Sequence, residues 1–96
     1  MVAYIIVRIN ITDAEQYKKY LQVVPGIIES YGGKAIVRAG KTETLEGVQE
    51  NRRMVILEFP SMEKAREFYY SREYQEAKKL RENAATGELV IVEGLN

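Results

Sequence analysis

The sequence predicts an α+β protein in which helices cover one face of a four-stranded antiparallel sheet. Three observations predict this fold class. Four short segments are dense in β-branched apolar residues, two longer segments carry apolar residues at helical spacing, and the order is β-α-β-β-α-β. Right-handed crossovers in this order place the strands as 4-1-3-2. The 96 residues fit a single domain, residues 1–96.

The first strand and the first helix follow directly from local patterns. Residues 2–11 are rich in Val and Ile and too short for a buried helix, so they predict a central strand. The run Thr12-Asp13-Ala14-Glu15 has the capping-box pattern, with Thr12 as the cap of a helix. Pro25 predicts a kink in this helix or a helix in two pieces. Gly32-Gly33 predicts its end.

Two further strands are expected in the middle of the chain. Residues 34–39 predict a short second strand, and residues 54–59 predict a third. The polar segment 40–51 lies between them, and residues 42–45 within it are a candidate extra edge strand. This segment is therefore expected to be the longest connection of the fold.

The last third of the chain predicts a helix in two parts and a final strand. Ser61 can cap the first part, and Ser71 can cap a second part that runs to about Asn83. Thr86-Gly87 predicts a turn into the last strand, residues 89–93. The complete order is that of a ferredoxin-like βαββαβ sandwich.

Composition excludes several classes of function. Lys plus Arg and Asp plus Glu both number 14, so the chain lacks the basic excess of a nucleic-acid-binding protein, and no nucleic-acid partner is expected. It contains neither Cys nor His, so thiolate and imidazole metal sites and the usual catalytic triads are excluded. Any catalysis must use Asp, Glu, Tyr, Lys, Arg or a bound cofactor, and no cofactor is expected.

The N-terminal segment predicts a cytoplasmic, unprocessed protein without a membrane partner. Residues 1–10 lack the basic start of a signal peptide, and Arg8 and Asn10 interrupt the apolar run. No segment approaches the roughly 20 apolar residues that span a bilayer. The absence of Cys also fits a reducing compartment.

Both faces of the predicted sheet are apolar, although the helices can cover only one of them. In the first strand, Ile5 and Val7 alternate with the equally apolar Tyr4 and Ile6. An open apolar face of this size exceeds what soluble monomers usually expose, so we expect a homodimer through the open sheet face. The alternative is that residues 40–52 or the C-terminal segment fold over that face.

The sequence also resembles the domain-of-unknown-function 1330 family over nearly its whole length. The residues that carry the resemblance are Val55-Ile-Leu-Glu-Phe-Pro-Ser61, Tyr70-Ser71, Leu80-Arg81, Val90-Ile-Val-Glu-Gly94, Gly32-Gly33, and Leu45-Glu46-Gly47 ahead of Arg53. Arg38-Ala39-Gly40 departs from the family, which often has two glycines after the arginine. The resemblance implies a dimeric α/β-barrel, two ferredoxin-like subunits with their sheets face to face, and implies no activity.

Charged residues of the sheet form the first candidate site. The period of two places Arg8 and Arg38 on the open face at one end of the sheet, and Glu58 on that face near the other end. Two arginines beside apolar surface can bind a small carboxylate or phosphate through forked hydrogen bonds. The alternative is structural ion pairing with Glu46, Glu58 or a carboxylate of the partner.

Tyrosines and one acid–arginine pair form further candidates. Among seven tyrosines, Tyr20, Tyr70 and Tyr74 are best placed to reach a pocket between the helices and the sheet. A phenol with a pKa near 10 is a poor base, and the alternative is that these rings only pack on the sheet. Glu46 and Arg53 predict a salt bridge that fastens the loop before the third strand, unless Glu46 serves as a general base.

Three functions are open at this point. The first is a homodimeric module that binds a small anionic or carboxylate ligand, in a pocket lined by Arg8, Arg38, Tyr20, Glu58 and Tyr74. The second is a cofactor-free enzyme, such as a monooxygenase or isomerase, in which Glu or Tyr moves the proton. The third is a structural or interaction role. Arginines in a pocket without an enclosed acid would favour binding, and an enclosed acid would favour the enzyme.

Overall fold

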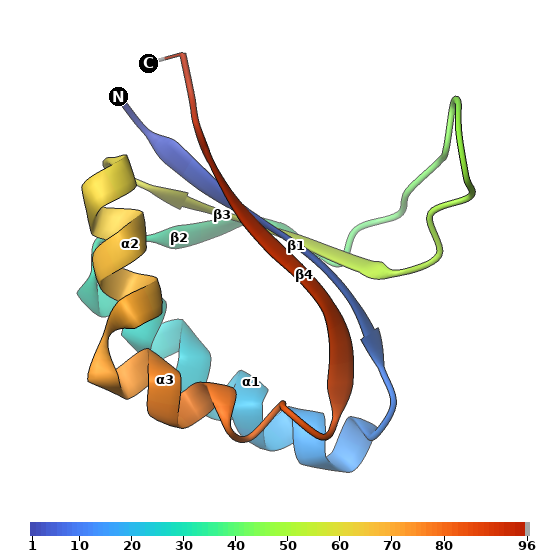
Figure 1. The fold of residues 1–96 in the computed structure, drawn as a ribbon, viewed down its shortest axis with the longest axis horizontal. Coiled ribbons are helices and arrows are strands. Elements are labelled where there is room, and N and C mark those ends of the chain that lie inside the picture. The colour runs from blue at the N-terminus through green and yellow to red at the C-terminus, as the bar shows by residue number, and fades with distance from the viewer. Residues whose placement is uncertain (96) are drawn as a thin grey trace.

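The sheet and helices have the predicted arrangement. The structure is a computed structural model and describes residues 1–95. Four antiparallel strands form one sheet in the order β2-β3-β1-β4, which confirms the predicted order. The helices lie on one face of this sheet (Figure 1). The strands are β1 (Ala3–Ile11), β2 (Lys34–Arg38), β3 (Arg53–Phe59) and β4 (Ala85–Glu93), and the helices are α1 (Ala14–Ser30), α2 (Met62–Tyr70) and α3 (Arg72–Lys78).

Helix α1 starts one residue later than the capping-box pattern predicts. Asp13 is the cap, and its carboxylate accepts a hydrogen bond from the Gln16 amide at 3.1 Å. The amides of Thr12 and Asp13 instead donate to the carbonyl of Ala84, at 2.8 and 3.1 Å. The prediction of Thr12 as the cap is wrong because this tertiary contact holds Thr12 outside the helix.

Pro25 does not divide α1, which runs as one helix to Ser30. A proline in a helix removes one backbone hydrogen bond and costs about 3 kcal/mol. Buried Tyr20 and Val24 before it and Ile28 after it hold both halves of α1 on the core, and this burial offsets the loss. The helix ends where the glycine pair predicts, with Gly32 at a φ of +80°.

Two serines start the helices of the second half, as predicted. Ser61 accepts a hydrogen bond from the Lys64 amide at 3.1 Å, and Ser71 accepts one from the Tyr74 amide at 3.0 Å. Helix α3 ends at Lys78, before the predicted end at about Asn83, and turns follow it. The turn predicted at Thr86-Gly87 is wrong, because β4 already pairs with β1 there.

A β-bulge changes the faces of β2. Ala35 pairs with Leu57 and Val37 pairs with Ile56, so Ile36 is an extra residue and the alternation is reset after it. Arg38 therefore pairs with Val55 and points to the helix side, whereas Arg8 pairs with Met54 on the open face. The predicted placement of Arg8 and Arg38 on one face is wrong for this reason.

The hydrophobic core lies between the helices and the facing side of the sheet. Rings of Phe59, Phe68 and Tyr74 stack through it, with centroids 5.1 and 4.7 Å apart. The opposite side of the sheet carries apolar residues without cover, which confirms the prediction of two apolar faces. The core residues with the least exposure are Ala3, Ile5, Ile9, Phe59, Ala65, Phe68, Tyr74 and Ala84.

Residues 39–52, which we call the arm, connect β2 and β3. The arm contains no strand, so the candidate edge strand at residues 42–45 is wrong. Figure 1 shows the arm extending away from the sheet on the side that the helices leave open. Leu45 and Val48 on the arm are almost fully exposed. Among residues 1–95, no helix is long and apolar enough to cross a bilayer.

Candidate functional site

A cavity of about 620 Å³ separates α1 from the helix-facing side of the sheet. Its walls are mostly aliphatic, because the inward stripe of α1 faces the inward residues of the strands. This size lies within the range of small-molecule sites. The aliphatic lining residues are Val7, Leu21, Val24, Ile28, Val55, Leu57 and Leu89.

Two arginines line the sheet side of the cavity. Arg53 pairs with Ile9 across the strands, so its side chain points to the helices, and Arg38 lies exposed at the rim. Within residues 1–95, the buried Nε of Arg53 has no hydrogen-bond partner. A buried donor without an acceptor costs about 1–3 kcal/mol, and more for a charged group. An oxygen of a ligand in the cavity could accept from this guanidinium.

A hydrogen-bonded pair of tyrosines lines the helix side. The hydroxyls of Tyr20 and Tyr74 lie 2.9 Å apart. Arg81 donates to the Tyr74 oxygen from Nη2 at 3.0 Å and from Nε at 3.3 Å, and its guanidinium lies 5.6 Å from the centroid of the Tyr20 ring. The Tyr17 ring packs against Tyr20 with centroids 5.3 Å apart. Three phenols therefore surround one end of the cavity.

These phenols are proton donors rather than bases. Burial raises the pKa of Tyr20 above its ordinary value, and the adjacent Tyr74 phenol raises it further. Burial also raises the pKa of Tyr17, although the charges of Arg53 and Arg81 oppose the rise. Both side chains are protonated at neutral pH and can offer a hydrogen to a ligand oxygen.

The structure brings together only part of the sequence-predicted site. Tyr20, Tyr74, Arg38 and Arg53 all line the cavity. Arg8 and Glu58 lie on the open face of the sheet, Glu46 lies exposed on the arm, and Tyr70 is exposed. These four do not line the cavity.

The charged residues of the open face form ion pairs, but Arg8 does not pair with Glu46 or Glu58, the intramolecular partners that the alternative interpretation named. The Nε of Arg8 lies 3.6 Å from Glu50, and Lys34 lies 3.7 Å from Glu58. No ion pair within residues 1–95 includes Glu46, so the predicted Glu46–Arg53 bridge is wrong. Arg53 points to the helices. Arg52, the last residue of the arm, forms the ion pair with Glu50 instead.

Sequence reasoning did not assign Tyr17 and Arg81 to the site. Tyr17 lies three residues before Tyr20 in α1, and Arg81 lies seven residues after Tyr74, which is a helical spacing although α3 itself ends at Lys78. This spacing was the signal available in the sequence. It does not indicate that the two groups of residues meet, because the contact between Tyr20 and Tyr74 joins residues 54 positions apart.

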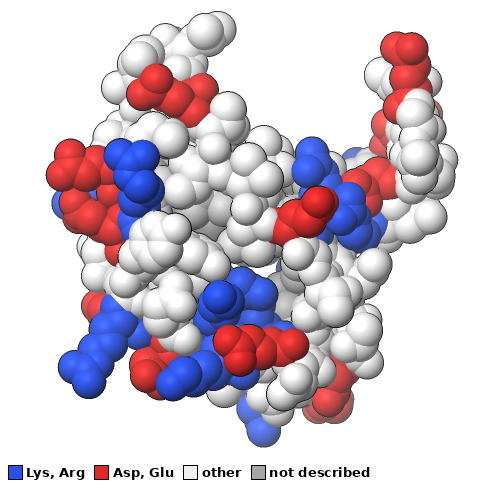
Figure 2. Space-filling model, viewed as in Figure 1, with Lys and Arg blue, Asp and Glu red and all other residues white. Residues whose placement is uncertain are grey.

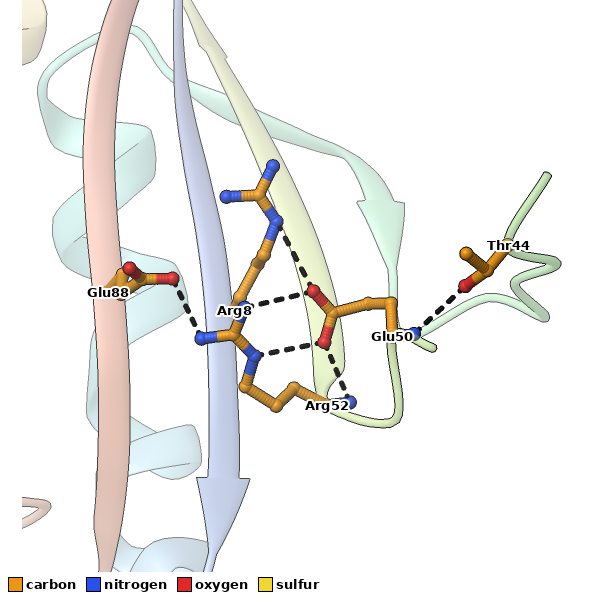
Figure 3. A network of polar contacts seen from close by, with 5 residues as sticks. All are labelled: Arg8, Thr44, Glu50, Arg52 and Glu88. Atoms are coloured by element: carbon orange, nitrogen blue, oxygen red, sulfur yellow. Dashed lines mark hydrogen bonds and ion pairs between the residues drawn. The ribbon is translucent and has the colours of Figure 1, made fainter. Parts of the chain in front are cut away.

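A second polar network holds the base of the arm (Figure 3). The Glu50 carboxylate accepts from Arg52 Nε and Nη2, both at 2.9 Å, and Arg52 Nη1 reaches Glu88 on β4 at 2.7 Å. The Glu50 amide donates to Thr44 Oγ1 at 2.9 Å. The network therefore fixes the arm to the central and edge strands.

This network predicts acid sensitivity. Hydrogen bonds from the Arg52 side chain and amide lower the pKa of Glu50 from 4.5 to about 2. Because the pKa is depressed in the folded state, the stabilisation is present above about pH 4.5 and is lost as the pH falls towards about 2. In urea unfolding, Glu50→Gln should lower the midpoint above pH 4.5, and its difference from wild type should shrink below that pH. Glu43→Gln, also on the arm, should show no such pH dependence.

These features define the chain as a ferredoxin-like α+β protein with a ligand-sized cavity beneath its helices. It belongs to the family described as Domain of unknown function (DUF1330), whose model matches residues 2–95. A comparison with curated proteins finds no match.

Solved structures show the same fold. RPA0582 from Rhodopseudomonas palustris, a protein of unknown function, is 25% identical with a TM-score of 0.78, over 99% of this chain and 83% of that one. SnoaB from Streptomyces nogalater, a cofactor-independent oxygenase, is 9% identical with a TM-score of 0.70, over 99% and 94%. A dimeric protein of unknown function and ferredoxin-like fold from Bacteroides fragilis is 13% identical with a TM-score of 0.57, over 97% and 96%.

Proposed function

We propose that the protein binds a small apolar organic anion in the cavity between α1 and the sheet. The observation that carries this proposal is the half-buried guanidinium of Arg53, which lines an apolar cavity and makes no side-chain hydrogen bond or ion pair within residues 1–95. A carboxylate beside this guanidinium would neutralise its charge. Arg38 at the rim adds a second positive charge.

The distribution of acids supports binding rather than catalysis. Glu46 and Glu58, the acids considered as general bases, lie outside the cavity. Among the described lining residues the one carboxylate is that of Glu29, which is exposed at the rim. The cavity thus offers arginines and protonated phenols to its ligand, and these groups recognise oxygen without removing a proton.

The binding module is a homodimer in this proposal, joined through the open face of the sheet. Val90 and Val92 on β4 are exposed there, and Ile6 and Ile56 pair beside them. Figure 2 shows a broad uncharged region in the middle of the molecule, with charges gathered near the base of the arm and near the helices. The dimeric state of the Bacteroides fragilis protein supports the same assembly here. We place the dimer in the cytoplasm, because the chain lacks Cys.

A cofactor-free enzyme is the second candidate. The buried Tyr20–Tyr74 pair, backed by Arg81, could deliver a proton to a bound molecule, and the fold is shared with the cofactor-independent oxygenase SnoaB. This candidate requires that a bound molecule be converted and that Tyr20→Phe stop the conversion. The binding module requires that the molecule be recovered unchanged, as mass spectrometry of the incubated mixture would show.

A pair of tryptophan substitutions tests binding in the cavity. Leu21 lines the cavity and is 38% exposed, whereas Val23 is 44% exposed and does not line it. With 4-phenylbutanoate as the probe in an NMR titration, Leu21→Trp should fill the cavity and weaken binding about tenfold or more, since displaced apolar contact costs 1.5–3 kcal/mol or so. Val23→Trp should leave binding unchanged. Equal affinities for both variants would contradict the proposal.

A further inference from the structure

The donors and acceptors around the Tyr74 hydroxyl can be counted, and the count indicates the direction of its hydrogen bonds. A phenol oxygen carries one hydrogen and two acceptor lone pairs, and a guanidinium only donates. The Tyr74 oxygen accepts from two nitrogens of Arg81, at 3.0 and 3.3 Å. Either hydroxyl could donate in the 2.9 Å contact between Tyr74 and Tyr20, and the two Arg81 contacts on the Tyr74 oxygen favour Tyr74 as the donor and Tyr20 as the acceptor.

This direction leaves the hydrogen of Tyr20 free. Tyr20 then accepts from Tyr74, and the nearby guanidinium of Arg81 can only donate, so among residues 1–95 no second group is found that could accept the Tyr20 hydrogen. The side chain is buried and lines the cavity. Its hydrogen is therefore the one that this chain of hydrogen bonds offers to the cavity.

We infer that Tyr20 donates a hydrogen bond into the cavity to a neutral oxygen of the ligand, and that the ligand is an apolar keto acid. The inference rests on the proposed function and adds a second point of recognition to it. Arg53 meets the carboxylate, and Tyr20 meets the ketone oxygen. Tyr20 and Arg53 both line this cavity, and the Tyr17 ring, which also lines it, packs against the Tyr20 ring.

The ligand class follows from the donors. Both groups offer a hydrogen to the cavity, so the ligand needs two acceptor oxygens. The aliphatic walls require the rest of the molecule to be hydrocarbon. A ketone beside Tyr20 fits better than a second carboxylate, because Tyr20 is neutral and buried and would leave a second charge unpaired.

Three matched probes separate the two recognition points. They are 3-benzoylpropanoate, which has both oxygens, 4-phenylbutanoate, which lacks the ketone, and butyrophenone, which lacks the carboxylate. By NMR titration, wild type should bind the keto acid about tenfold more tightly than 4-phenylbutanoate, the upper range for one net hydrogen bond. Butyrophenone should bind at least tenfold more weakly than the keto acid, since the contact with the guanidinium is lost.

Two variants assign each difference to one side chain. Tyr20→Phe should bring the keto acid to the affinity of 4-phenylbutanoate and leave the latter unchanged. Arg53→Gln should weaken both acids and leave butyrophenone unchanged. Tyr70→Phe, which removes an exposed phenol outside the cavity, is the control and should change nothing.

The outcomes distinguish the role of Tyr20 from the proposed binding of an anion. If wild type binds both acids equally, or if Tyr20→Phe keeps the preference for the keto acid, the role of Tyr20 is overturned and anion binding stands. If no acid binds to wild type, both fall together. The comparison of probes on wild type gives its answer even where a variant folds poorly.

Discussion

Val90→Asp should convert the protein from a dimer to a monomer at micromolar concentration. Val90 lies on the open face of the sheet, opposite Ile6 of β1, and is 51% exposed in the single chain. In the proposed assembly, this remaining surface is buried against the partner. A carboxylate at this position would have to lose its water without gaining a partner.

The size of the effect follows from symmetry. A two-fold interface repeats each substitution on both subunits, so each loss counts twice. Burial of a whole valine side chain is worth about 1.5–3 kcal/mol, and because Val90 is 51% exposed before assembly, about half of this is lost per subunit and about 1.5–3 kcal/mol over two copies before the charge is considered. The dissociation constant should therefore rise roughly 100-fold or more, which light scattering coupled to size exclusion would detect.

Val23→Asp is the matched control for this substitution. Val23 lies on α1 and is 44% exposed, close to the exposure of Val90, but it is on the helix side of the molecule. It should leave the assembly unchanged. A wild-type chain that is monomeric at these concentrations, or a Val90→Asp variant that stays dimeric, would contradict assembly through the open face.

The strand order could be predicted because right-handed crossovers restrict how a β-α-β-β-α-β chain can be arranged, and the two apolar faces could be predicted because they depend on local periodicity. Alternation along β1 assigns Ile5 and Ile9 to one face and Ile6 to the other, whatever the rest of the chain does. The face of Arg38 could not be predicted in this way. The bulge at Ile36 resets the alternation, and nothing in the residues of β2 marks it, because it arises from pairing with β3.

The helix start shows a similar limit. Thr12 and Asp13 can both cap a helix, and the local pattern favours Thr12 because of Glu15 three residues later. The choice is made by the carbonyl of Ala84, which is 72 positions away in the chain and binds both backbone amides. Sequence reasoning sees the two candidates and cannot see the contact that selects one.

The candidate site was predicted in part for the same physical reason. Tyr20 and Tyr74 could be proposed because they lie in predicted helices that pack on the sheet, where an aromatic side chain can reach a pocket between the two layers. The role of Arg53 could not be predicted from the sequence. Its position in β3 determines the side to which it points, but the lack of a hydrogen-bond partner at its buried Nε depends on how the neighbouring elements pack.

Gly87→Ala in β4 should strongly destabilise the fold, because the backbone of β1 lies close to Gly87. A Cβ atom on Gly87 would overlap the carbonyl oxygen of Arg8 and lie 2.7 Å from Cα of Ile9. Both are backbone atoms of a central strand, so they cannot move aside as a flexible side chain can. Overpacking of a well-packed region costs about 1–3 kcal/mol. Because the overlap is with backbone, we expect Gly87→Ala to reach the upper end of that range, roughly 3 kcal/mol.

The same substitution at Gly26 should have the opposite sign. Gly26 lies in α1, and no atom would lie within 4 Å of an added Cβ. Alanine is favoured over glycine inside a helix by about 0.5–1 kcal/mol, so Gly26→Ala should stabilise the protein. Thermal unfolding at one fixed protein concentration would compare the two, since a domain of this size shifts by roughly 4–8 °C per kcal/mol. A Gly87→Ala variant with an unchanged melting temperature would show that β1 and β4 separate more easily than their register implies.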